Sequence, residues 1–192
     1  RALLDQKLSL LQKLDQDQYV FKHPNFFGAS IGGHIRHSLD HFKRALAATQ
    51  TKEVGADASA SASASASPPV LSLDYDERSR GGAVETDIEA AAQACMLQRR
   101  IVDSLDLEVS PSAAARLWER PLAAVFLADA GTGVSYSVPT TFERELSFCA
   151  HHATHHLAMS RLMLVSTGSG VALDGSIGMA NSTARHQKSD QD

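Results

Sequence analysis

Apolar side chains recur at helical spacing in several segments of the chain. Between Leu3 and Leu14 the leucines follow one face of a helix with 3.6 residues per turn. Two further segments, residues 31–49 and 84–105, have the same helical spacing. Ser30, just before the first, and Thr86, near the start of the second, are candidate N-caps. The predicted helices cover residues 1–15, 31–49, 84–105 and 139–166.

Residues 121–138 follow a different pattern. The apolar run PLAAVFL and the alternating run VSYSV flank a glycine-containing turn, which predicts two short strands in a hairpin. The polar run LDYDERSRGG is typical of a turn. Four helices with one hairpin predict an all-α fold: an up-down four-helix bundle, with a small β-hairpin before the last helix. We expect one domain over residues 1–185.

Two segments are predicted to lie outside this core. Residues 54–69 contain an alternating Ala/Ser run followed by two prolines. Such small side chains bury too little area to offset the entropy of ordering, so we expect a flexible loop insertion. Residues 186–192 form a polar tail that is predicted to be disordered.

Composition narrows the function classes. The net charge is −4 and no Lys/Arg-rich block occurs, so the sequence offers no electrostatic footprint for nucleic acid. No apolar run approaches the roughly 18 residues of a membrane span. The two cysteines, Cys95 and Cys149, lack the spacing of a disulfide framework, which favours the cytoplasm. The chain opens on Arg1 rather than methionine, so a missing N-terminal targeting segment stays an alternative.

Histidines carry the strongest chemical signal. The chain has nine, and most fall in the runs IGGHIRHSLDHF and CAHHATHHLA. On a helix, residues three or four apart share a face, so each run presents imidazoles side by side. The first run contains His34, His37 and His41, and the second contains His151, His152, His155 and His156.

An i,i+4 histidine pair is a good metal clamp, because both rings can converge on one ion, and the other helix can supply a further ligand. Spacing alone leaves open whether His151 and His155 or His152 and His156 point inward. Imidazole nitrogens suit Zn, Ni, Fe or Cu and disfavour Mg and Ca. Asp40 and His41 are candidate catalytic groups that would orient a ligand or move a proton, with solvated helix-face residues as the alternative.

The runs SIGGHIRHSLDHF, LDYDERSRGGAVETD, VPTTFERELSFCAHHATHHLAMSRLM and GMANST together resemble the DinB-like superfamily, in an uncharacterised branch. The resemblance extends over residues 3–185. It implies a helical bundle that holds a divalent metal through His37, His152 and His156, with Zn, Ni or Fe as the candidates. His34, His41, His155 and His151 are then neighbours or alternate ligands.

The sequence departs from the branch pattern at His151 and Cys149, which replace a small and an apolar residue. Cys149 is either a soft fourth ligand or, as the more ordinary interpretation, a small buried hydrophobe. Three arginines are candidates for recognising the carboxylate of a thiol, although salt bridges that close the D-Y-D-E-R-S-R loop are the favoured interpretation; they are Arg36, Arg78 and Arg80.

Known activities in the superfamily largely use low-molecular-weight thiols. The resemblance therefore implies a metal-dependent thiol S-transferase whose partners are a small thiol and an electrophilic small molecule, with a homodimer as a further expectation. The alternative is a non-catalytic or stress-response module with a structural metal. A metal-free scaffold whose histidines sense pH is a third hypothesis.

Overall fold

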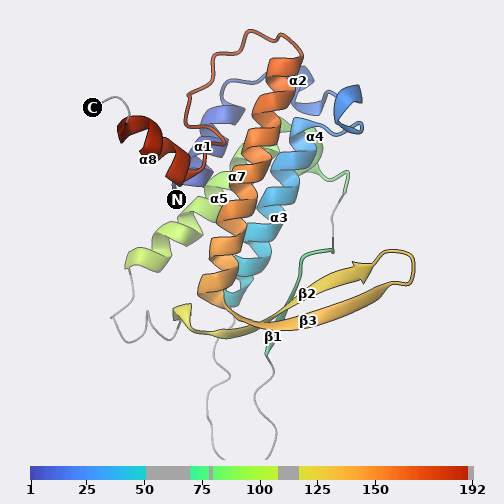
Figure 1. The fold of residues 1–192 in the computed structure, drawn as a ribbon, viewed down its shortest axis with the longest axis vertical. Helices are drawn as coiled ribbons and strands as arrows, with labels where there is room; N and C mark the ends of the chain where they lie inside the picture. The colour runs from blue at the N-terminus through green and yellow to red at the C-terminus, as the bar shows by residue number, and fades with distance from the viewer. Residues whose placement is uncertain (51–69, 78–79, 108–116, 190–192) are drawn as a thin grey trace, which may run out of the picture.

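The computed structural model describes residues 1–50, 70–77, 80–107 and 117–189. Helices α1 (Ala2–Leu11), α3 (Ile31–Gln50), α5 (Ile88–Leu107) and α7 (Phe142–Ser166) pack against one another (Figure 1). The shorter helices are α2 (Gln16–Val20), the 3-10 turn η1 (Pro24–Phe26), α4 (Ala83–Thr86) and α8 (Asn181–Ser189). The Ala/Ser insertion predicted at 54–69 and residues 190–192 of the tail lie outside the described ranges, whereas 186–189 belong to α8.

The expectation of an all-α bundle with only a hairpin is wrong. Three strands form a mixed sheet, in the order β1 (Leu71–Asp74), β2 (Pro121–Asp129) and β3 (Val134–Thr141). The hairpin of β2 and β3 is antiparallel as expected, but β1 adds a parallel pairing that places Leu71 beside Leu122. The third strand forms because this segment alternates between the two faces of a sheet. Leu73 and Tyr75 are buried, whereas Ser72 and Asp74 are exposed.

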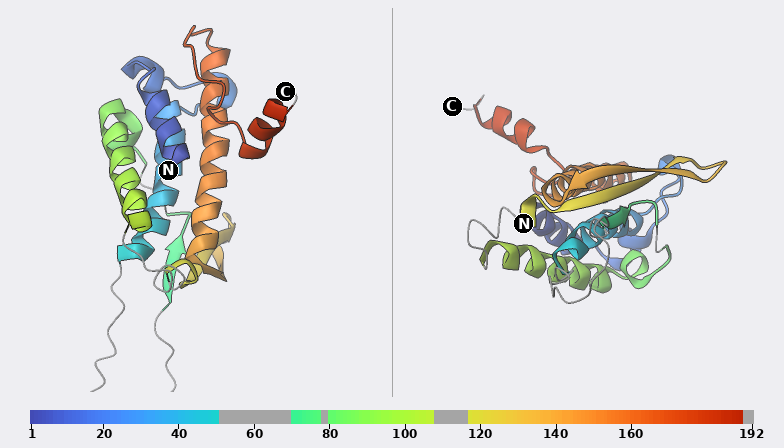
Figure 2. Two further views of the ribbon diagram at one scale, coloured as in Figure 1. Left: turned by 90° about the vertical axis from the view of Figure 1, so that its left-hand side faces the viewer. Right: turned by 90° about the horizontal axis from the view of Figure 1, so that it is seen from below.

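The sheet lies across one end of the helices, and the β2–β3 hairpin projects beyond them (Figures 1 and 2). Two contacts hold the chain at this end. Arg120 donates from Nη1 to the carbonyl oxygen of Ala48 near the end of α3, and β1 begins where Leu71 pairs with Leu122. The end of α3 and the beginning of β1 are therefore both fixed beside the start of β2.

The core forms where the apolar faces of the helices meet. On α3 the buried positions recur every three or four residues, as the sequence predicts; they are Ile31, Ile35, Leu39, Phe42 and Leu46. They join one cluster with Leu10 of α1, Ala91 of α5 and Leu157 of α7. No helix in the described ranges combines the length and hydropathy that crossing a bilayer requires.

Short polar side chains set the helix starts. Ser30 accepts a hydrogen bond from Gly33 N (3.1 Å), so its predicted role at the start of α3 is confirmed. Thr86 is not the cap of α5, because the chain makes the separate helix α4 first and Asp87 then accepts from the amides of Glu89 and Ala90. The last helix begins at Phe142, later than predicted, because β3 continues to Thr141, whose side chain caps α7.

Gly32 permits a close approach between the backbones of α3 and α4. A Cβ at this position would lie 2.2 Å from the carbonyl oxygen of Glu85, which is in α4. The adjacent Gly33 is in ordinary surroundings, since its nearest neighbour would be Ser30 Oγ at 3.4 Å. Glycine at position 32 is thus what lets α4 lie against the first turn of α3.

Candidate metal centre

Helices α3 and α7 bring the two histidine runs together. His34 lies beside His156, and His37 lies beside His152. Residue numbers that rise along α3 therefore lie beside residue numbers that fall along α7. The two helices therefore run in opposite directions, and each turn of one faces a turn of the other. We call His34, His37, His41, His152 and His156 the histidine cluster.

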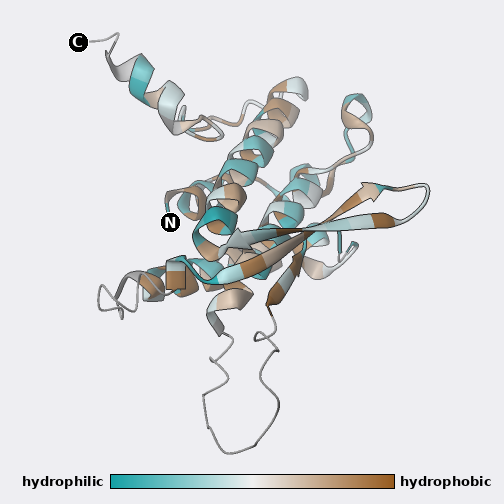
Figure 3. Cartoon of the chain, turned by 60° about the horizontal axis from the view of Figure 1, so that its bottom comes forward, coloured by the Kyte–Doolittle hydropathy of each residue, from teal (hydrophilic) through white to brown (hydrophobic). Residues whose placement is uncertain are grey.

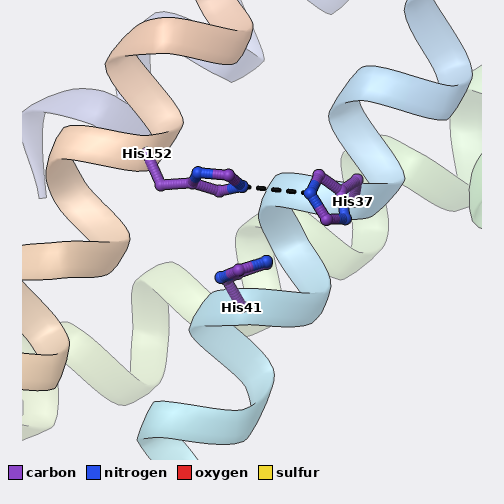
Figure 4. A group of neighbouring side chains, drawn as sticks. All are labelled: His37, His41 and His152. Carbon is purple, nitrogen blue, oxygen red and sulfur yellow. Dashed lines mark hydrogen bonds between the residues drawn. The ribbon is translucent and has the colours of Figure 1, made fainter. Parts of the chain in front are cut away.

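His152 is at the centre of the cluster. Its Nε2 atom lies 3.0 Å from Nε2 of His37 on the facing helix and 3.0 Å from Nε2 of His156, one turn away on its own helix. Nε2 of His152 thus lies within 3.0 Å of a ring nitrogen from each helix. Figure 4 shows His37 and His152 approaching each other from the two helices, with His41 beneath them.

These separations match what a bound ion requires. Two nitrogens at metal–nitrogen distances of about 2.0–2.1 Å, at angles between square and tetrahedral, lie roughly 2.9–3.4 Å apart. Both Nε2–Nε2 distances to His152 fall in this range. The donor set present is all imidazole, and these two distances are compatible with ligands of one ion.

A second grouping shares two of these residues. His37, His41 and His152 each offer a ring nitrogen, and the three atoms lie within 4.8 Å of one another. Three histidines therefore lie close enough together to hold a metal ion. His37 and His152 occur in both groupings, and His156 and His41 compete for the third place.

Burial acts on His156 in the direction that metal binding needs. The side chain is 8% exposed, and burial together with the neighbouring His152 and His37 lowers its pKa from 6.5 to about 2. The ring is therefore neutral at ordinary pH, with a lone pair available. Burial also lowers the pKa of His34.

The remaining histidines lie elsewhere. His151 and His155 of α7 are exposed, so the structure places the 152/156 pair, rather than the 151/155 pair, toward α3. His155 stays near the cluster, with its ring centroid 5.2 Å from that of His156. His23 is buried in a separate turn, where its backbone pairs with Ala29.

Asp40 points into an ion-pair network instead of the histidine cluster. Its Oδ2 lies 3.1 Å from Nη1 of Arg36, whose Nε lies 3.4 Å from Glu85 of α4. Arg36 is 8% exposed, so this network connects α3 to α4 rather than facing solvent. Of the other two candidate arginines, Arg80 is exposed and Arg78 lies outside the described residues.

Cys149 belongs to the core. It is fully buried, its Sγ lies 3.8 Å from the hydroxyl of Tyr75, and burial raises the pKa of its thiol to about 12. A thiol with a raised pKa is a poor metal ligand, because metals bind the thiolate. The small-hydrophobe interpretation of Cys149 fits these surroundings.

Two aromatic residues that the histidine pattern does not single out enclose one side of the cluster. The ring of Tyr75 stacks on His41, with 4.7 Å between centroids and 13° between planes. The ring of Phe148 stacks on His152 at 5.6 Å and 24°. They stand in the runs LDYDERSRGGAVETD and VPTTFERELSFCAHHATHHLAMSRLM, which carry the resemblance and are the sequence signal that could have identified them.

Comparison with known proteins adds little to this geometry. No protein-family profile matches the chain, and no solved structure matches it. A curated protein from Rhizopus delemar named FK506-binding protein 5 is 28% identical over 120 residues, which cover 62% of this chain. The chain spans only 28% of that protein's length, and the similarity does not establish a family for the chain.

Proposed function

We propose that this chain binds one divalent transition-metal ion between α3 and α7, through Nε2 of His37, His152 and His156. The observation that carries the proposal is the pair of 3.0 Å separations between these nitrogens, made by residues from two helices. A neutral His156 supports it further, since no proton must leave that ring before the ion binds. Imidazole donors favour Zn, Ni or Fe over Mg and Ca.

The resemblance of the motifs to the DinB-like superfamily remains part of this proposal. The quoted runs supply every residue of the cluster and both aromatic neighbours. The parallel strand β1 is a feature that the expected helical bundle lacks. On the basis of the shared motifs we propose an S-transferase role, in which a small thiol loses its proton and its sulfur displaces a leaving group, such as a halide ion, from an electrophilic small molecule.

A bound divalent ion would lower the pKa of a coordinated thiol or water, so that the ligand loses its proton near neutral pH. The residues of the chain supply the rest of the site. His37 and His152 are only partly buried, so part of each side chain is in contact with solvent. Tyr75 and Phe148 stack on His41 and His152, and these contacts hold the two imidazoles in place.

A structural role for the metal is the competing function. A site that serves only stability would use four protein ligands and keep no open position. His41 is the candidate fourth ligand, because one of its ring nitrogens lies within 4.8 Å of those of His37 and His152. The two roles therefore differ in whether His41 coordinates the ion.

Metal analysis of protein purified without chelator tests the binding proposal. We expect about one equivalent of metal per chain, and its loss in His37→Ala, His152→Ala and His156→Ala. His151→Ala is the matched control, because this exposed histidine lies on the same helix. If His151→Ala loses metal as readily as His152→Ala, or if all variants retain it, the assignment is wrong.

His41→Phe separates the two roles of the metal. Phenylalanine retains a ring to stack on Tyr75 but offers no nitrogen. Retained metal in this variant, together with thiol transfer from glutathione to a chromogenic aryl halide, supports the transferase. Loss of metal, with no thiol transfer by the wild-type protein, supports a closed structural site.

A further inference from the structure

Strand β3 forms one edge of the sheet. The strand order is β1, β2, β3, and in the described part of the chain only β2 pairs with β3. Every residue from Val134 to Pro139 is exposed, and the hairpin projects away from the helices (Figures 1 and 2). The outer edge of β3 therefore presents backbone donors and acceptors that a further strand can use.

The strand lacks the usual protection of an exposed edge. Soluble proteins commonly place charged side chains, above all lysine, on such strands to prevent pairing. No charged residue occurs in β3, and its apolar side chains are exposed: Val134 by 56%, Tyr136 by 51% and Val138 by 41%. In Figure 3 the projecting hairpin carries brown, apolar segments separated by pale or teal ones. Proline occurs only toward the end of the strand, at Pro139.

The sequence of the edge is a palindrome. Residues 134–138 read Val-Ser-Tyr-Ser-Val in both directions. If two copies pair antiparallel about a two-fold axis at Tyr136, each residue faces one of its own kind. Tyr136 then faces Tyr136, the valines face valines, and Ser135 faces Ser137 of the other copy. Aromatic and β-branched cross-strand pairs stabilise antiparallel sheets, and a two-fold interface must be self-complementary in this way.

We propose that β3 pairs with β3 of a second copy of this chain, joining the two three-stranded sheets into one. The absence of charge on the strand favours a second copy as the occupant, since identical charged strands would repel each other across the axis. The ring of Tyr136 stacks on Phe126 of β2, with 5.6 Å between centroids, so the central residue of the edge is already supported within its own hairpin.

The contact is small. One strand of this length buries less than the roughly 800 Å² per partner of a standard interface. We therefore expect an association that depends on protein concentration rather than an obligate dimer. The proposal does not depend on metal binding, because no residue of the histidine cluster belongs to β3.

Sedimentation over a concentration series, on the full chain, tests the proposal with two double variants. In S135K/S137K, antiparallel pairing about Tyr136 sets lysine against lysine, and we expect dimerisation at least about tenfold weaker than in the wild type. In S135K/S137E the same pairing sets lysine against glutamate, and we expect the dimer to persist. A wild-type protein that stays monomeric throughout overturns the proposal, as does an equal effect of the two variants.

A cross-link tests the register independently of affinity. Tyr136→Cys places two thiols opposite each other at the axis, within reach of a disulfide, so mild oxidation should give a covalent dimer. Ser135→Cys is the control, because its two copies are offset along the strands beyond bridging distance. The native Cys95 and Cys149 are buried and should not contribute. Equal cross-linking of both variants, or none in either, contradicts the assigned axis.

Discussion

The Nδ1 atoms of His34 and His156 lie 2.7 Å apart, so one ring must donate an N–H to the other. If Nε2 of His156 binds metal, its Nδ1 carries the proton and His34 is the acceptor. His34 would then fix both the tautomer and the orientation of a metal ligand without touching the ion.

We expect His34→Ala to weaken metal affinity by about 10–100-fold while leaving one binding site per chain, as loss of such supporting partners does. Titration with Zn²⁺ and a competing chelator measures this. The control is His155→Ala, which removes an exposed imidazole near His156. Unchanged affinity in His34→Ala would show that the contact between the two rings does not serve the metal.

Lys7 is a source of instability in the core. It is fully buried, its Nζ lies 4.7 Å from the centroid of Phe42, and no hydrogen-bond partner for Nζ occurs in the described residues. Burial lowers its pKa from 10.5 to about 8. Below about pH 8 both the folded and the unfolded chain hold the proton, so the full penalty for a buried charge applies. We expect Lys7→Met to stabilise the fold by about 2–3 kcal/mol at neutral pH.

The pH dependence gives the check. Between pH 8 and 10.5 the unfolded state binds more protons than the folded state at this lysine, so the wild type gains stability as the pH rises. Urea unfolding at several pH values should show that Lys7→Met loses this gain. Parallel pH profiles for the two proteins would refute the assignment.

His156 makes stability depend on pH in the same direction as Lys7, but in the acid range. Its pKa is lowered from 6.5 to about 2, so below pH 6.5 the unfolded chain takes up a proton that the folded chain does not. Metal-free protein should therefore lose stability as the pH falls through 6.5. We expect His156→Gln to flatten this part of the profile in chelator-treated samples. A slope as steep as in the wild type would assign the acid sensitivity to other groups.

Gly32 and Gly33 form a matched pair of helix glycines. An alanine Cβ at position 32 would collide with the carbonyl oxygen of Glu85, whereas one at position 33 meets only ordinary contacts. We expect Gly32→Ala to destabilise the fold by about 1–3 kcal/mol, and Gly33→Ala to stabilise it by up to about 1 kcal/mol, through helix propensity. Thermal unfolding distinguishes the two, and equal effects would show that α4 does not lie against α3 as described.

Helical periodicity predicted the long helices because their apolar residues lie on local, repeating faces. Strand β1 escaped prediction for the opposite reason. It has only four residues, in which leucines alternate with polar residues. It also depends on pairing with β2, a strand far along the chain. A pattern confined to LSLD cannot reveal that a distant strand will lie beside it, and so the mixed sheet was missed.

The histidine cluster, too, was predictable from local spacing only in part. The i,i+4 spacing predicts that histidines of the last helix form a clamp, but both pairs satisfy it equally. Only the way α7 packs on α3 decides that His156 is buried and His151 exposed. The stacking of Tyr75 on His41 was likewise unpredictable from spacing, because it depends on where the segment after β1 meets α3.

The two contacts that hold the chain beside β2 have a consequence for chain length. Ala48 is bound to Arg120, and Leu71 is paired with Leu122, so the two ends of the stretch between Ala48 and Leu71 are both fixed beside the start of β2. The entropy of closing such a loop grows only with the logarithm of its length, at about 0.6 kcal/mol for each doubling. Shortened, lengthened or exchanged sequences should therefore be accepted at this position, which makes it a suitable point for inserting a reporter domain.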